Sequence, residues 1–362
     1  MPDPIIPALA QTRVVKFARV RRERLLPTRG VVMVTAGNRV GALDVVAKVT
    51  SAGNVRPVPL ARYLRTKETA LDKYLLKQPG EDFAAREILA SKPESFGMLR
   101  RIYRAPKAGR IVAAQGAWLA LDLADTAFEL RALYRGTVIN VMARQGVVIE
   151  ATGALVQGMW GAGGEGYGVI RQMVDQPDAL LSDDRIDVTA RGTVLLAGAG
   201  ITEAALRRAA EERVAGLIVG GLAPGLRRLC AELELPTLVT DGFGECAMSK
   251  MIFELLAAHV GEETIINAPT VPVSPSRPEA FIPILAGGGA GETAVPPPTL
   301  LAQVGANVRV VSGALRGQIG KIAEIATLPR TLESGVAAWG AEITFDTGAR
   351  LFVPWENLEL IG

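Results

Sequence analysis

The chain has 362 residues, too many for one ordinary hydrophobic core, so we expect about two to four domains. Hydrophobic residues make up 49% and charged residues 21%, the composition of a folded protein. The formal net charge of +3 neither demands a nucleic-acid partner nor excludes one.

Few residues suit metal or redox chemistry. Cys230 and Cys246 provide no framework for disulfides or zinc, and His259 is the only histidine, so we expect no metal and no cofactor. The N-terminus lacks the apolar core of a signal peptide, and no stretch reaches the ~18 apolar residues that span a membrane. These features predict a cytoplasmic protein without membrane contact.

Basic residues are concentrated before residue 30. We interpret residues 1–25 as a solvated basic arm, with phosphates or anionic lipid as alternative partners for it. The basic cluster comprises Arg13, Lys16, Arg19, Arg21, Arg22, Arg24 and Arg29.

Residues 26–178 are predicted to form strands joined by glycine turns. Valines alternate with small or polar residues between Leu26 and Lys48. The phrase GNRVGALDVVA at residues 37–47 returns as GEDFAAREILA at residues 80–90, with the same order of glycine, acidic and apolar positions. This recurrence, with further hairpin patterns at residues 105–121 and 136–150, predicts repeated β-hairpins.

These phrases resemble the barrel-sandwich hybrid fold of lipoyl- and biotin-carrier domains. The resemblance covers Leu26 to Thr152 and implies a flattened β-sandwich. Carrier domains modify a lysine at a hairpin tip, whereas here Lys48 follows a strand and Lys107 precedes the turn at Gly109. We therefore expect a lipoyl-like sandwich that serves docking or ligand contact rather than a covalent swinging arm.

A helical insert interrupts these strands between Val58 and Leu76. Apolar residues three and four positions apart predict one or two short amphipathic helices. The polar face is interpreted as solvated, with a nucleic-acid patch as the alternative. Its basic residues, with two neighbouring tyrosines, are Arg62, Arg65, Lys67, Lys73, Tyr63 and Tyr74.

A glycine-rich loop at the middle of the chain has the GxGxxG spacing of dinucleotide-binding loops. Such a loop must lead from a buried strand into a long helix, but a short strand-like segment closed by proline follows here. We therefore favour a turn between strands in which glycines supply positive φ angles. The glycines are Gly161, Gly163 and Gly166, and the position of the loop predicts an inter-domain cleft lined by Gln157, Trp160, Glu165 and Tyr167.

Residues 179–266 show an alternation of strands and helices. Strands are predicted at 192–196, 216–219 and 236–240, and helices at 202–213, 225–234 and 245–259, with Thr202 as the N-cap of the first helix. This alternation predicts a small parallel sheet with right-handed crossovers.

The segments AGLIVGGL at Ala215 to Leu222, Pro224 and LPTLVT at Leu235 to Thr240 resemble the swivelling α/β domains known as DRTGG domains. That resemblance implies a regulatory or docking module with at most a small-molecule site at the strand ends. The alternative is that the glycines there only form tight turns. The candidate ligand-binding residues are Ala197, Gly198, Gly200, Thr202, Gly220, Gly221, Asp241, Gly242 and Phe243.

Residues 267–298 are rich in proline and contain a run of three glycines, so we predict a linker. Residues 299–362 resemble the KOW domain, an SH3-like β-barrel of ribosomal proteins and transcription elongation factors. The resemblance rests on VGANVRVVSGALRGQIGK at 304–321 and VPWENLEL at 353–360. It implies contact with RNA or a protein through Arg309, Ser312, Leu315, Arg316, Gln318 and Lys321, although nearby glutamates weaken the basic field.

The sequence thus predicts a multidomain α+β protein: a barrel-sandwich-like β domain, a parallel-sheet α/β domain and a terminal SH3-like barrel. No complete catalytic constellation is present, and we favour a non-enzymatic modular adaptor that binds RNA, a component of the ribosome or RNA polymerase, or another protein. The alternative is a regulatory sensor of a nucleotide or other anion. An enzyme that uses Cys246 is the least favoured interpretation.

Overall fold

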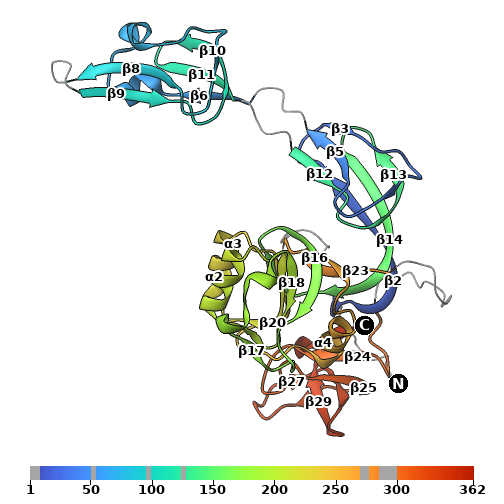
Figure 1. Ribbon diagram of the computed structural model, residues 1–362. Helices are drawn as coiled ribbons and strands as arrows, with labels where there is room; N and C mark the ends of the chain where they lie inside the picture. Colours follow the sequence, from blue (N-terminus) through green and yellow to red (C-terminus); the bar gives the residue numbers. More distant parts are fainter. Residues whose placement is uncertain (1–8, 50–53, 95–98, 124–127, 270–276, 285–299) are drawn as a thin grey trace.

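The computed structural model describes residues 9–49, 54–94, 99–123, 128–269, 277–284 and 300–362, and the structural statements below concern these residues. The described chain is mostly β and forms several sheets with a few short helices (Figure 1). The prediction of a multidomain α+β protein is confirmed at this coarse level. No described helix is long and apolar enough to cross a membrane.

The first β module comprises residues 14–49 and 128–157. Its larger sheet has the strand order β2-β14-β13-β4 and its smaller sheet the order β3-β5-β12. Apolar side chains from both sheets, including the fully buried Val46 and Ile149, form one core. The strands are β2 (Val14–Leu25), β3 (Val31–Val32), β4 (Arg39–Val40), β5 (Val45–Val49), β12 (Phe128–Arg131), β13 (Gly136–Met142) and β14 (Gly146–Gln157).

An inserted β module, residues 54–123, follows β5 in the chain and precedes β12. It has a sheet of order β6-β11-β10-β7 and a second pair, β8 with β9. Its core cluster contains only its own residues, and Figure 1 shows it apart from the rest of the molecule. Its elements are β6 (Asn54–Val58), α1 (Leu60–Leu64), η1 (Glu68–Ala70), η2 (Asp72–Tyr74), β7 (Asp82–Phe83), β8 (Ile88–Glu94), β9 (Leu99–Arg104), β10 (Gly109–Gln115) and β11 (Trp118–Leu123).

The two β modules share one topology. Strands β6, β7, β8, β9, β10 and β11 pair with one another as β2, β4, β5, β12, β13 and β14 do. The inserted module interrupts the first module between β5 and β12, which correspond to its own β8 and β9. The chain therefore contains a nested duplication, one copy of the fold placed within a hairpin of the other.

The repeated phrase has the same local structure in both copies, so the predicted repeat is confirmed. The predicted hairpin is wrong at this phrase, because β4 and β5, like β7 and β8, pair with other strands and not with each other. Asp44 Oδ2 accepts a hydrogen bond from the Gly41 N–H at 2.7 Å, and Glu87 Oε2 accepts one from the Ala84 N–H at 2.7 Å. Each acidic side chain closes the turn that leads into the next strand, β5 or β8.

A glycine at the start of β13 and of β10 lets the paired strand approach equally closely in both copies. A Cβ atom at Gly136 would lie 2.1 Å from the Glu150 carbonyl oxygen, and one at Gly109 would lie 2.2 Å from the Asp122 carbonyl oxygen. Only glycine fits at either position without a shift of the backbone.

An α/β module extends the larger sheet of the first module. Strand β14 pairs with β23, β23 with β22 and β22 with β16, and the described sheet reaches 11 strands. Strands β16, β18, β20 and β21 run parallel, which confirms the predicted parallel sheet. The predicted sandwich boundary at residue 178 is wrong, because β15 and β16 belong to the α/β sheet.

The elements of the α/β module are β15 (Trp160–Ala162), β16 (Glu165–Gln172), β17 (Leu180–Leu181), η4 (Asp183–Arg185), η5 (Val188–Ala190), β18 (Thr193–Leu196), β19 (Gly200–Ile201), α2 (Glu203–Glu211), β20 (Gly216–Leu222), α3 (Leu226–Glu232), β21 (Thr237–Phe243), α4 (Lys250–Ala257), β22 (Glu263–Asn267) and β23 (Glu279–Pro283). Thr202 caps α2 as predicted, since its side chain accepts a hydrogen bond from the Ala205 N–H at 3.1 Å. Helix α4 begins at Lys250 rather than near Glu245, because residues 244–249 form a loop.

The C-terminal module is a six-stranded sheet of order β1-β30-β24-β25-β28-β29. Its first strand comes from the other end of the chain, because β1 pairs in parallel with β30. Its core includes Trp355, which is 1% exposed. The elements are β1 (Ala10–Thr12), β24 (Asn307–Val310), β25 (Ile319–Ile325), β26 (Arg330–Thr331), β27 (Ala337–Ala338), β28 (Gly340–Phe345), β29 (Arg350–Pro354), η6 (Trp355–Asn357) and β30 (Leu358–Ile361).

The predicted solvated arm is wrong for residues 9–25. Strand β2 pairs with β14 along its length, and three of its cations, Arg21, Arg22 and Arg24, pair with carboxylates. Arg22 lies 2.7 Å from Glu279, and Arg24 lies 2.6 Å from Glu165. Residues 1–8 of the predicted arm lie outside the described residues.

The predicted linker is wrong at β23, which lies between β14 and β22 in the large sheet. The buried Glu279 accepts hydrogen bonds from Arg22 and from Tyr134 Oη, the latter at 2.6 Å. Burial and the charge of Glu279 raise the pKa of Tyr134 well above its ordinary value, so the hydroxyl stays protonated and donates. Residues 270–276 and 285–298 of the predicted linker lie outside the described residues.

Candidate functional site

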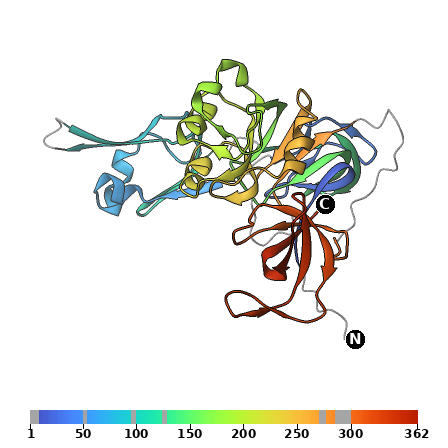
Figure 2. The same ribbon diagram turned by 90° about the horizontal axis from the view of Figure 1, so that it is seen from below.

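The C-terminal module packs against the carboxyl end of β21 (Figures 1 and 2). Arg309 on β24 donates through Nη1 to the Thr240 carbonyl oxygen at 2.9 Å and to Asp241 Oδ1 at 2.7 Å. Arg316 Nη2 donates to the Phe243 carbonyl oxygen at 2.8 Å. Carboxyl ends of parallel strands are where α/β sheets usually bind ligands, and here a second module occupies part of that edge.

Arg309 is the centre of a buried ionic network. Its side chain is 1% exposed, and its Nη2 lies 2.6 Å from Glu359 Oε2. The other oxygen of Glu359 accepts hydrogen bonds from Thr12 Oγ1 at 2.7 Å and from Arg277 Nη1 at 2.8 Å. Segments from both ends of the chain and from β21 therefore meet at two cations and two carboxylates.

The network favours the charged forms of Arg309 and Glu359. Burial alone would lower the pKa of Arg309, but the charges of Asp241 and Glu359 outweigh it and raise the pKa. Burial alone would raise the pKa of Glu359, but the charge of Arg309 and the hydrogen bond from Thr12 hold it below its ordinary value. Loss of either partner would leave an uncompensated buried charge.

The residues predicted to contact RNA do not form one open face. Arg309 is buried in the network, so the prediction that it contacts an external partner is wrong, because no solvent reaches its guanidinium. Leu315 packs against the core of the C-terminal module, and Arg316 is engaged with Phe243. Ser312, Gln318 and Lys321 are exposed.

The predicted ligand residues lie at the strand ends, but three of their backbone amides donate to carbonyl oxygens of the protein. The Gly220 N–H donates to the Gly198 carbonyl oxygen at 2.8 Å, and the Thr202 N–H donates to Leu181 at 3.0 Å. The Gly221 N–H is likewise engaged, by Ala199 at 3.1 Å. These hydrogen bonds argue against an anion at those three amides, and the wider loop site stays a prediction.

Gly198 and Gly220 allow close packing of the backbone, a role that neither sequence interpretation gave them. A Cβ atom at Gly220 would lie 2.5 Å from the Met248 backbone nitrogen, and one at Gly198 would lie 2.5 Å from the Ala179 carbonyl oxygen. Ala197 and Gly200 are buried beside them.

The last three predicted ligand residues, Asp241, Gly242 and Phe243, contact other residues of the protein. Asp241 accepts a hydrogen bond from the Ser249 N–H at 3.1 Å, so besides pairing with Arg309 it supports the start of α4. A Cβ atom at Gly242 would lie 2.7 Å from Arg316 Nη2. The ring of Phe243 lies 4.7 Å from the Arg227 guanidinium.

The four residues predicted to line one inter-domain cleft are dispersed. Gln157 accepts a hydrogen bond from the Arg13 N–H at 3.2 Å, while Trp160 packs edge-on against Phe243. Glu165 pairs with Arg24. Tyr167 lines a different cleft, beside Arg19, Arg39 and Arg135. The glycine loop itself is a turn between β15 and β16 with positive φ at Gly163 and Gly164, which confirms the preferred interpretation.

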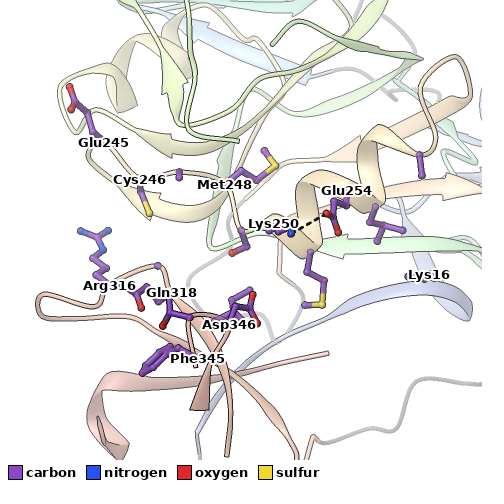
Figure 3. A pocket seen from close by; sticks show the side chains of 18 residues that line it. Lys16, Glu245, Cys246, Met248, Lys250, Glu254, Arg316, Gln318, Phe345 and Asp346 are labelled. Carbon is purple, nitrogen blue, oxygen red and sulfur yellow. Dashed lines mark ion pairs between the residues drawn. The ribbon is translucent and has the colours of Figure 1, made fainter. Parts of the chain in front are cut away.

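A cleft of about 960 Å³ lies between the α/β module and the C-terminal module (Figure 3). One wall comes from the loop before α4 and from α4 itself, the other from residues 316–319 and 345–347, and Lys16 of β2 also borders it. Its volume is within the range of small-molecule sites in proteins, about 300–1,000 Å³.

The lining of the cleft is mixed in charge and partly apolar. Three cations and three carboxylates border it, with Lys250 and Glu254 paired at 3.8 Å. Met248, Met251 and Leu255 supply apolar surface. The charged residues are Lys16, Lys250, Arg316, Glu245, Glu254 and Asp346. Sequence reasoning considered Lys16, Glu245 and Arg316 for other sites and did not place any two of these residues together, because their meeting depends on how two modules dock.

Cys246 lies in this cleft, but its environment does not favour a nucleophilic thiolate. Burial and the charge of Asp241 raise the pKa of the thiol above its ordinary value. In the described part of the chain no three His, Cys, Asp or Glu side chains gather in a way that could hold a metal ion. The lining can thus bind through hydrogen bonds, charge and apolar contact.

No protein family, curated protein or solved structure matches the chain.

Proposed function

We propose that the protein is a non-enzymatic regulatory protein of the cytoplasm that binds a small polar molecule in the cleft between its α/β and C-terminal modules. The observation that carries this proposal is that two modules joined by a buried ionic network together line a cleft of about 960 Å³.

The cleft favours a ligand that carries both acidic and basic groups. Three cations and three carboxylates border it, so its lining has no net charge to concentrate a polyanion. A zwitterion of the size of an amino-acid derivative satisfies both signs and can place an apolar part against Met248 and Leu255. This replaces a nucleotide or simple anion as the proposed ligand class.

A thermal-shift screen of zwitterionic metabolites, with nucleotides and phosphate as comparison ligands, tests the proposal. A ligand at 100 times its dissociation constant stabilises the folded state by about 2.7 kcal/mol. The shift should disappear in Lys16→Ala and Asp346→Ala and persist in Lys321→Ala, which removes an exposed charge away from the cleft. No shift with any zwitterion, or equal shifts in all variants, would contradict the proposal.

Binding of a protein through the C-terminal module is a second candidate function. Ser312, Gln318 and Lys321 remain exposed there, and residues 300–362 contain five basic and six acidic residues. This balance favours a protein over RNA as partner of that module. A Ser312→Arg, Lys321→Glu double variant that keeps its fold but loses a captured partner would support the idea, and unchanged capture would refute it.

A further inference from the structure

The charges of the chain are strongly segregated. Residues 1–157 contain 25 basic and 13 acidic residues, whereas residues 158–362 contain 15 basic and 24 acidic residues. Such asymmetry between halves indicates a polyanionic partner for the basic half. The net charge of +3 conceals this, because the two halves offset each other.

Within the basic half, the first β module uses several of its cations inside the molecule. Arg22 and Arg24 pair with carboxylates of the α/β module, at 2.7 Å from Glu279 and 2.6 Å from Glu165. Those arginines join the two parts of the protein.

The inserted β module keeps its charge excess. Its residues 54–123 include 13 basic and 7 acidic residues. The ion pairs described for it stay inside the module, such as Arg101 with Glu94 at 2.8 Å and Arg110 with Asp82 at 2.7 Å. A net charge of +6 is therefore presented to solvent.

Like charges face each other on the β8–β9 hairpin of this module. Lys92 and Arg101 are directly opposite in the strand register, an arrangement that destabilises a sheet. Lys92 Nζ is held by the carbonyl oxygens of Leu64 and Arg65, at 3.1 and 2.6 Å, and Arg101 by Glu94. The hairpin thus keeps two adjacent cations although their repulsion opposes strand pairing.

Aromatic rings lie beside these cations. Tyr63 on α1 is 50% exposed, and its ring meets the ring of Tyr103 edge-on, with centroids 5.2 Å apart. Tyr103 follows Arg101 by two residues on β9, so both lie on the face of the hairpin that contacts α1. An exposed ring held by another ring, with cations around it, is the arrangement on which unpaired bases stack.

The first β module shows that the fold does not demand this surface. Strands β6 and β7 enclose α1, η1 and η2, whereas the corresponding strands β2 and β4 enclose only β3 and loops. The insert supplies Arg62, Tyr63 and Arg65. One copy of the duplicated fold has therefore gained a basic and aromatic surface that the other lacks.

We propose that the inserted β module binds single-stranded nucleic acid, with a base stacked on Tyr63 and the backbone phosphates following Arg62, Arg65 and Arg101. This proposal is independent of the ligand cleft and assigns nucleic-acid contact to a module other than the C-terminal one. Each neutralised phosphate adds a slope of about −0.7 to the logarithmic salt dependence of single-strand binding.

Fluorescence anisotropy of the full chain with labelled 12-nucleotide oligouridine and oligothymidine, between 50 and 300 mM salt, tests the proposal. We expect salt-dependent binding, about 5- to 150-fold weaker in Tyr63→Ala and close to wild type in Tyr63→Phe, which keeps the ring. Arg62→Gln should lower the slope by about 0.7, whereas Arg29→Gln, an equal loss of exposed charge in the first β module, should not.

Comparison of the affinities for the two oligonucleotides shows whether the module binds RNA or DNA more tightly. Circular dichroism spectra matching that of the wild type would show that each variant is folded. Absence of salt-dependent binding, or equal effects of Arg62→Gln and Arg29→Gln, would overturn the proposal. Binding only to vesicles with phosphatidylserine, unaffected by Tyr63→Ala, would overturn it in favour of a lipid surface.

Discussion

Arg309 determines how the C-terminal module docks. Its guanidinium faces Asp241 at 2.7 Å and Glu359 at 2.6 Å, and all three side chains are at most 1% exposed. We expect Arg309→Met to destabilise the protein by about 3–5 kcal/mol, because two buried carboxylates lose their cation. Urea unfolding of the purified variant measures this loss.

Arg316→Met is the matched control for that substitution. Arg316 also donates to the α/β module, but it is exposed and makes one hydrogen bond to a carbonyl. Its loss should cost about 1 kcal/mol or less. Equal losses in the two variants would contradict the role given to the buried network.

The network also predicts the acid sensitivity of the protein. The pKa of Glu359 is depressed in the folded state, so its contribution is complete above its unfolded pKa of about 4.3 and is lost as the pH falls through the folded value. Stability measured from pH 6 to pH 2 should fall below about pH 4. The fall should be shallower in Glu359→Gln, and identical profiles would argue against this linkage.

The partners of Arg309 could not be predicted from the sequence. The burial of its guanidinium depends on Asp241 and Glu359, which lie 68 and 50 residues away in the chain. No local pattern encodes such pairing, and the resemblance to an RNA-contacting loop implied the opposite environment.

Within single elements, the turn between β15 and β16 allows two effects of glycine to be measured separately. One is its tolerance of a positive φ angle, and the other is its lack of a Cβ atom where the backbone is crowded. Gly163 and Gly164 both have positive φ angles, of +82° and +90°. A Cβ atom at Gly163 would lie 2.0 Å from the Leu235 carbonyl oxygen, whereas one at Gly164 would have no atom within 4 Å. Gly164→Ala should cost about 1–2 kcal/mol from backbone strain alone. Gly163→Ala should cost clearly more in thermal unfolding, and equal costs would show that the turn adapts.

Elements with a local signal were predictable, and those fixed by tertiary contacts were not. The parallel strands β18, β20 and β21 are continuous apolar runs between turn residues, and α2 has a capping threonine, so each was predicted near its observed place. Strand β23 lies among prolines and is held by Glu279, whose partners come from β2 and Tyr134. Proline content alone indicated a linker there.

At the scale of the whole molecule, the nested duplication predicts that the inserted module can be removed. Val49 on β5 is opposite Phe128 on β12, so deletion of residues 54–123 leaves residues 50–53 and 124–127 to close an antiparallel pair. The core cluster of the inserted module contains only its own residues. We expect the remainder to fold with an unchanged main melting transition in calorimetry, and failure to fold would contradict the division into modules.

The docking of the C-terminal module on the α/β module forms the cleft and buries Arg309, so the proposed function depends on it. A Cβ atom at Gly317 would lie 3.3 Å from Cys246 Sγ, whereas one at Gly313, on the same loop with the same φ of +85°, would have nothing within 4 Å. The most direct measurement is peptide mapping by mass spectrometry after mild oxidation of Gly317→Cys and Gly313→Cys. We expect an intramolecular disulfide to Cys246 in Gly317→Cys and little in Gly313→Cys. Equal or absent cross-linking in the two folded variants would contradict it.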